Sequence, residues 1–185
     1  MSKGRLFVIS GASGVGKSSV LGLVMKQCPG LQFSVSATTR PPRPGEADGV
    51  NYYFISKEQF QQMIAEDAFV EYDAHMGNYY GTPKRELQEK LQYGDLFLDI
   101  EPVGAFNVRK INPEAILIFI TPPSIQELER RLRSRGDTSE EQMQLRLERA
   151  QWEMEQSKQY NYVVVNDVLE DCAKEIMNII AKEAE

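Results

Sequence analysis

One stretch near the start of the chain restricts its possible folds more than any other. Residues 11–18 read Gly-Ala-Ser-Gly-Val-Gly-Lys-Ser and fit the pattern G-x-x-x-x-G-K-[ST] in full. An apolar run, 6–9, precedes them, and residues 17–26 follow with apolar side chains spaced along one helical face. A glycine-rich turn between a strand and a helix lets successive N–H groups point inward at phosphate oxygens. The pattern and its context together predict a phosphate-binding loop.

The loop contains the groups that binding of a nucleoside triphosphate requires. Lys17 reaches the β- and γ-phosphates, Ser18 offers a hydroxyl to Mg²⁺, and the following helix adds its positive N-terminal end. An apolar strand ends at Asp99, which places a carboxylate beside the Mg²⁺ that accompanies ATP in such a site. We therefore predict Ser18 and Asp99 as metal ligands, with Asp99 acting through water. The predicted ATP-binding residues of the loop are Gly11, Ala12, Ser13, Gly14, Val15, Gly16, Lys17 and Ser18.

The rest of the chain alternates short apolar runs with helical patterns, which is typical of an α/β fold with a parallel sheet flanked by helices. Runs that are apolar throughout, such as 116–120 and 163–165, predict strands covered on both faces. Together with the loop, this order predicts a P-loop NTPase fold. Segment 40–81, which contains several prolines and tyrosines, departs from the alternation and predicts a small mixed β insertion. The expected strands are 6–10, 33–37, 96–100, 116–121 and 162–165.

Composition excludes several classes of protein. The 185 residues suffice for one compact domain, and a net charge of −6 disfavours nucleic acid as a partner. No apolar stretch is long enough to cross a bilayer, so we expect no membrane partner. Cys28 and Cys172 lie far apart and the chain has one histidine, so neither a disulfide nor a zinc site is expected. These features predict a cytoplasmic protein and do not determine its oligomeric state.

A phosphate-binding loop indicates a nucleotide but not a reaction. A GTPase would normally carry an N-K-x-D segment that reads guanine, and Asn166-Asp167 lacks the lysine. The chain is also short for a motor ATPase. These exclusions favour a kinase that acts on a small molecule.

Several further segments are specific to one family of such kinases. Residues 34–46 read S-V-S-A-T-T-R-P-P-R-P-G-E, and residues 77–81 read G-N-Y-Y-G. These segments, together with residues 69–72 and 164–167, resemble guanylate kinase. The resemblance covers nearly the whole chain in order. The resemblance implies phosphoryl transfer from ATP to GMP within a single domain, residues 1–185. It also implies a core (1–33, 84–125 and 148–185), a GMP-binding region (34–83) and a helical lid (126–147).

The residues themselves agree with a nucleoside monophosphate as acceptor. Arg40 and Arg43 place two planar guanidinium groups three residues apart, which suits a phosphate. Guanine presents two donors, N1–H and the 2-amino group, that a carboxylate matches, and an O6 that requires a donor. The resemblance assigns Glu71 to the donors and Thr82 to O6, so adenine should be rejected strongly. The GMP-binding residues that it implies are Ser36, Arg40, Arg43, Tyr52, Glu71, Tyr80, Thr82 and Glu101.

Residues 131–136, which read R-L-R-S-R-G, and Arg146 after them resemble the lid of the family. Arginines of the lid are implied to cover charge on the transferring phosphoryl group. The lid residues implied to be catalytic are Arg131, Arg135 and Arg146, which act together with Lys17 of the phosphate loop. Asn166 is implied to lie near the adenine of ATP. We expect Arg130 and Arg133 to lie on a solvated helix face, paired with Glu127, Glu129 and Glu141.

Three positions depart from the family pattern, and two other functions compete. Glu101 stands for an aspartate and is one methylene longer, Val103 stands for a glutamine, and Val168 stands for a second acid.

The alternative functions are a catalytically silent guanylate-kinase-like protein-interaction module and a kinase of another nucleoside monophosphate. The complete loop disfavours the first alternative, and Glu71 with Thr82 disfavours the second.

Overall fold

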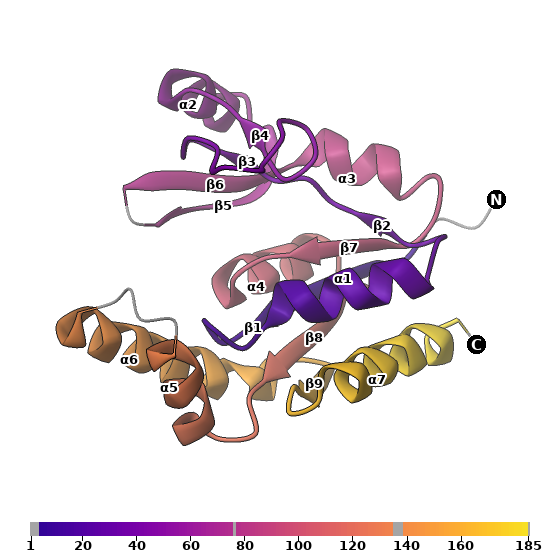
Figure 1. Ribbon diagram of the computed structural model, residues 1–185. Coiled ribbons are helices and arrows are strands. Elements are labelled where there is room, and N and C mark those ends of the chain that lie inside the picture. Colours follow the sequence, from indigo (N-terminus) through magenta and orange to yellow (C-terminus); the bar gives the residue numbers. More distant parts are fainter. Residues whose placement is uncertain (1–3, 76, 135–138, 185) are drawn as a thin grey trace. The chain divides into compact units, whose positions relative to one another are not determined.

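A computed structural model describes residues 4–75, 77–134 and 139–184, whose elements are labelled in Figure 1. Strands and helices alternate along most of this chain, as the sequence predicts for an α/β fold. The strands are β1 (Leu6–Gly11), β2 (Gln32–Phe33), β3 (Ala37–Thr38), β4 (Tyr53–Phe54), β5 (Phe69–His75), β6 (Asn78–Pro83), β7 (Leu96–Asp99), β8 (Ile116–Thr121) and β9 (Tyr162–Val165). The helices are α1 (Lys17–Gln27), α2 (Lys57–Ala65), α3 (Lys84–Lys90), α4 (Pro102–Ile111), α5 (Ile125–Arg133), α6 (Glu140–Gln156) and α7 (Leu169–Lys182).

The strands form two sheets. A five-stranded sheet has the order β2-β7-β1-β8-β9, and its pairs β2–β7 and β8–β9 are parallel. A four-stranded sheet has the order β4-β3-β6-β5 and mixes the parallel pair β3–β4 with the antiparallel pairs β3–β6 and β5–β6. The predicted fold class is confirmed, including its small mixed β insertion.

The prediction of a single strand at 33–37 is wrong. β2 ends at Phe33 in one sheet, and β3 begins at Ala37 in the other. Between them, Val35 donates its N–H to the carboxylate of Glu86 at 3.0 Å instead of to a neighbouring strand. Because a buried acid satisfies the backbone where the chain changes sheets, the hydrophobic pattern of the segment carries no sign of the break.

Burial confirms the prediction for two of the fully apolar strands but not for the third. The side chains of residues 6–9 in β1 and 116–120 in β8 are buried, as strands covered on both faces require. In β9, Val164 is fully buried, whereas Val163 and Val165 are 45% and 47% exposed. β9 lies at the edge of its sheet in the described part of the chain, and alternate residues of this edge strand face solvent.

Internal contacts divide the chain into two compact units. The first comprises Met1–Val8 and Gly30–Ala115 and contains the four-stranded sheet. In this unit, helix α4 packs against strand β5 of that sheet. The second comprises Ile9–Pro29 and Ile116–Glu185, in which α1 packs against α7. Each unit carries one part of the predicted site. The functional division into core, GMP-binding region and lid stays a prediction.

Candidate active site

The glycine-rich loop of the second unit depends on its glycines for its course. Gly14 and Gly16 have φ angles of +88° and +91°, a left-handed conformation that side-chain-bearing residues rarely adopt. A β-carbon on Gly14 would lie 2.5 Å from Leu132 Cδ2, and one on Gly11 would lie 2.8 Å from the carbonyl oxygen of Ile120. The chain is therefore curled tightly between β1 and α1, as binding of a phosphate tail requires.

A buried carboxylate holds one amide of this loop. Glu153 of α6 is 1% exposed, and its Oε2 accepts the N–H of Ser13 at 2.9 Å. Its Oε1 accepts a hydrogen bond from Arg149 Nε at 3.0 Å. The sequence analysis missed Glu153, because a glutamate on a helix ordinarily faces solvent. The available signal is its position three residues after Ala150, on the buried stripe of α6.

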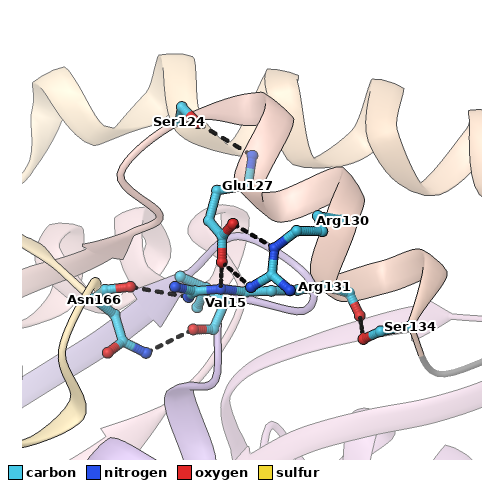
Figure 2. A network of polar contacts seen from close by, with 7 residues as sticks. All are labelled: Val15, Ser124, Glu127, Arg130, Arg131, Ser134 and Asn166. Atoms are coloured by element: carbon cyan, nitrogen blue, oxygen red, sulfur yellow. Dashed lines mark hydrogen bonds and ion pairs between the residues drawn. The ribbon is translucent and has the colours of Figure 1, made fainter.

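Asn166 and Arg131 lie together beside the loop (Figure 2). The Nδ2 of Asn166, a residue that is 6% exposed, donates to the carbonyl oxygen of Val15 at 2.7 Å. Arg131 Nη1 donates to the carbonyl oxygen of Asn166 at 2.9 Å, and Arg131 Nε donates to Glu127 Oε1 at 2.7 Å. The structure thus joins a predicted lid arginine, the predicted adenine-site residue and the phosphate loop.

Glu127 fixes the arginines at the middle of α5 (Figure 2). Its backbone N–H donates to the hydroxyl of Ser124, which caps the helix, and its carboxylate forms ion pairs with Arg130 and Arg131. Hydrogen bonds from Arg130 and then Arg131 lower the pKa of Glu127 to about 2. The carboxylate therefore stays charged at neutral pH and keeps both guanidinium groups in place.

The remaining arginines of the predicted lid have separate surroundings. Arg133 pairs with Glu129 as expected, but its second partner is Glu140, so the predicted pairing with Glu141 is wrong. Glu140 is the first residue of α6. Arg146 lies half-buried on α6, and Arg135 lies outside the described residues. The catalytic roles of these side chains stay predictions.

In the first unit, Glu71 and Thr82 face each other across two strands. β5 and β6 pair in a register that places these residues opposite one another, and Thr82 Oγ1 donates to Glu71 Oε1 at 2.6 Å. Thr82 is fully buried and Glu71 is 9% exposed. Burial raises the pKa of Glu71, opposed by the Thr82 hydrogen bond, while the charges of Asp73 and Glu101 raise it further. The predicted guanine-reading pair is thus held together by a direct hydrogen bond.

The predicted phosphate-binding residues gather around Arg40. Its Cζ lies 5.4 Å from the ring centre of Tyr52, and the hydrogen bond to Glu46, with a smaller contribution from Tyr80, raises its pKa. Its Nη1 and Nη2 each donate to one carboxylate oxygen of Glu46 at 2.9 Å. The backbone N–H of Arg43 donates to the same carboxylate at 2.7 Å. Arg40, Tyr52 and Tyr80 therefore form one group, and an acid ties Arg40 to the backbone of Arg43.

Glu46 is the second site residue that the sequence analysis missed as a functional group. The Arg40 guanidinium and the Arg43 N–H hold its pKa at about 2, so it is an anion at neutral pH. Its spacing of six residues from Arg40, inside a proline-rich loop, matches no helical or strand period. Only the fold of this loop brings the two charges together.

The other predicted site residues lie at element ends. The carbonyl oxygen of Ser36, just before β3, accepts the N–H of Tyr53 at 2.9 Å. Exposed Glu101 precedes α4, and Asp99 ends β7 with its Oδ1 buried. Ser18 lies in the first turn of α1. Within residues 4–75, 77–134 and 139–184, no group of three or more His, Cys, Asp or Glu side chains could hold a metal ion.

Comparisons with known proteins identify close relatives over almost the whole chain. The family model described as "Guanylate kinase" matches residues 3–183. A guanylate kinase of Thermus thermophilus is 48% identical over 182 residues, which is 98% of this chain and 82% of that protein. One from Neisseria gonorrhoeae is 47% identical over 179 residues, 96% of this chain and 87% of the relative.

Solved structures give the same result for the fold. The crystal structure of guanylate kinase from Anaplasma phagocytophilum matches with a TM-score of 0.80 and 31% sequence identity. It covers 99% of this chain, and 87% of that protein is matched. Among the described helices of the present chain, none is long and apolar enough to span a membrane.

Proposed function

The chain belongs to the guanylate kinase family, and we propose on that basis that it transfers the γ-phosphoryl group of ATP to GMP, yielding ADP and GDP. The observation that carries this proposal is the buried Glu71–Thr82 pair, with 2.6 Å between Oε1 and Oγ1, in a chain that also has a complete phosphate loop. A carboxylate beside a hydroxyl matches the donors and the acceptor on the edge of guanine. The intact loop disfavours a silent interaction module, and the pair disfavours another nucleoside monophosphate.

At the donor end, the loop amides and Lys17 bind the β- and γ-phosphates. Ser18 and, through water, Asp99 would hold the Mg²⁺ that accompanies ATP, and both offer the hard oxygen atoms that this ion prefers. When bound, Mg²⁺ neutralises charge on the two terminal phosphates. The acceptor phosphate is itself anionic, so no side chain has to remove a proton from it. Catalysis then rests on positioning and on covering negative charge.

At the guanine, Glu71 accepts N1–H and the 2-amino group while Thr82 donates to O6. The Thr82 hydroxyl has one proton, which it donates to Glu71 in this structure. When GMP enters, guanine N–H donors replace that proton at Glu71, and the hydroxyl is released to turn toward O6. Adenine would present an acceptor at N1 to the carboxylate and leave Glu71 unsatisfied, which strongly disfavours AMP. Glu101 and Ser36 are proposed to complete this part of the pocket.

At the acceptor phosphate, Arg40, Arg43, Tyr52 and Tyr80 supply donors. Glu46 acts as a positioning residue for them, because it binds both Nη atoms of Arg40 and the N–H of Arg43. A guanidinium has five N–H donors, so pairing with Glu46 leaves donors for a phosphate. Preordering of this loop lowers the entropy that GMP binding would otherwise cost.

Replacing Glu46 with alanine is expected to raise KM for GMP roughly three- to tenfold, with little change in kcat, because Arg40 loses its charge-assisted orientation. Steady-state rates over a range of GMP concentrations at saturating ATP measure this effect. Glu46→Gln, which keeps one acceptor, should lie between the wild type and Glu46→Ala. A lower KM in Glu46→Ala would contradict the positioning role, since it would mean that Glu46 competes with the phosphate.

The arginines of α5 and α6 cover the transferring phosphoryl group in this proposal. Arg131 is anchored for that role by Glu127 and by the carbonyl of Asn166, and Asn166 in turn supports the loop. Arg135 and Arg146 act with it as further positive charges. Closure of this segment over ATP would also exclude water and limit wasteful hydrolysis.

The raised pKa of Glu71 predicts an acid limb for the use of GMP. A protonated carboxyl cannot accept both guanine donors, so GMP binding is lost as pH falls through the pKa of Glu71. Because burial raises that pKa above its ordinary value of 4.5, kcat/KM for GMP should begin to fall at a higher pH than an ordinary glutamate would cause. Profiles of kcat/KM for GMP against pH measure the position of this acid limb. Persistence of the same limb in Glu71→Gln would contradict the assignment.

A coupled assay of ADP formation with GMP, AMP, CMP and UMP tests the proposed function. GMP should exceed the other acceptors by about 10⁴ in kcat/KM, since a site built to hydrogen-bond one base leaves buried groups unpaired with another. Equal rates with AMP would reject guanine recognition, and no ADP formation with any acceptor would favour the interaction module.

The setting of the enzyme is proposed from its thiols. Cys28 and Cys172 are both free, and burial raises the pKa of Cys172 to about 11. Two unpaired cysteines, one of them a buried thiol of raised pKa, agree with the reducing cytoplasm, where disulfides are rare.

A further inference from the structure

Gly104 lies against the carboxylate of Glu71. A β-carbon on Gly104 would lie 2.6 Å from Glu71 Oε2, 3.1 Å from Cδ and 3.3 Å from Cγ. Gly104 is the third residue of α4 and is buried. The bare backbone of this first helical turn therefore fills the space directly beside one carboxylate oxygen.

The other oxygen of the same carboxylate is fixed as well. Glu71 Oε1 accepts the Thr82 hydroxyl at 2.6 Å, and the β5–β6 register holds the two residues opposite each other. Contacts between α4 and β5 place the helix against the strand that carries Glu71. The carboxylate of Glu71 thus has one oxygen at a hydroxyl and the other at a glycine.

Helix formation does not explain a glycine at this position. Glycine is among the least favourable residues in a helix, and the φ of Gly104 does not lie in the left-handed range that would require it. The space taken by Glu71 does explain it, because any side chain would need to displace the carboxylate. The obstructing atoms belong to the far end of a flexible side chain and not to the backbone.

We propose that Gly104 is a specificity-determining positioning residue: its missing side chain lets the Glu71 carboxylate lie where it can accept N1–H and the 2-amino group of guanine. Gly104 acts through Glu71 and need not touch the base. The inference rests on the proposed function, because it assumes that Glu71 reads guanine.

Gly104→Ala separates this role from a structural one. The added methyl should push the Glu71 carboxylate away from its site and raise KM for GMP at least about tenfold, while KM for ATP stays near the wild-type value. Because alanine is a better helix former than glycine and the clash falls on a movable side chain, Tm should hold or rise. A variant that folds as well but recognises GMP worse is the expected signature.

Gly22 provides the matched control. It lies exposed inside α1, and a β-carbon there would have no heavy atom within 4 Å. Gly22→Ala makes the same chemical change in a helix without an obstructed carboxylate. It should raise or preserve Tm and leave KM for both substrates unchanged.

A double-mutant cycle with Glu71→Gln then tests whether Gly104 acts through Glu71. Gly104→Ala should raise KM for GMP much less in the Glu71→Gln background than in the wild type, since coupled residues are not additive. An unchanged KM for GMP in Gly104→Ala, full additivity, or a joint rise of both KM values with a lower Tm would each overturn the inference. If Glu71→Gln itself leaves GMP use intact, the proposed function fails instead, and the assays tell these outcomes apart.

Discussion

Replacing Lys17 with alanine is expected to lower kcat at least about 10³-fold, because the loop then lacks the positive charge that stabilises the γ-phosphoryl group in the transition state. The fold should survive, since Lys17 opens α1 and is not part of the buried core. Single-turnover ADP formation at saturating ATP and GMP measures the loss. Circular dichroism tests whether the fold is retained, and a GMP titration tests whether the acceptor site is retained.

Lys26 offers a matched control on the same helix. It lies exposed in the last turn of α1, so Lys26→Ala removes an equal charge away from the loop. It should leave kcat and both KM values near those of the wild type. Full activity in Lys17→Ala, or an equal loss in Lys26→Ala, would contradict the assigned role of the loop.

Glu71→Gln should lower kcat/KM for GMP about 10²- to 10³-fold, because the amide cannot accept two guanine donors and places an NH₂ group beside them. The affinity for ATP should change little, since the loop lies in the other compact unit. Preference for GMP over AMP should shrink by a similar factor. Steady-state kinetics with both acceptors, together with ATP-analogue titration, measure the two effects separately.

An exposed acid of the same unit controls for the loss of charge. Glu66 directly follows the last residue of α2 and is exposed, so Glu66→Gln changes the net charge equally without touching the pocket. Its kinetic constants should match those of the wild type. A Glu71→Gln variant that loses ATP affinity more than GMP use would contradict the pocket.

Local signals in the sequence predict much of this structure. The loop 11–18 combines required glycines with an apolar strand and a helix, and each of these is local, so the fold class follows from it and the alternating pattern. Glu71 and Thr82 could be paired only through the family resemblance, because their contact depends on the register of two strands and joins residues eleven positions apart.

What the sequence does not reveal depends on contacts over longer distances. The break in the expected strand 33–37 requires Glu86, 51 residues from Val35. Glu153 supports a loop amide 140 residues away, and its acidic character alone suggests a solvated position. The role of Gly104 is likewise visible only once Glu71 is packed against α4. In each case the role of a polar or small residue depends on a distant contact partner, which the periodicity of the sequence does not identify.

The most direct test of the central claim is a crystal structure of the protein with GMP, Mg²⁺ and a non-hydrolysable ATP analogue. The account predicts the GMP phosphate on Arg40 and Arg43, the triphosphate tail in the loop at Lys17, and an acceptor oxygen about 3–3.5 Å from the γ-phosphorus. A GMP phosphate bound away from Arg40 and Arg43, or separated from the γ-phosphorus by several further ångströms, would contradict it.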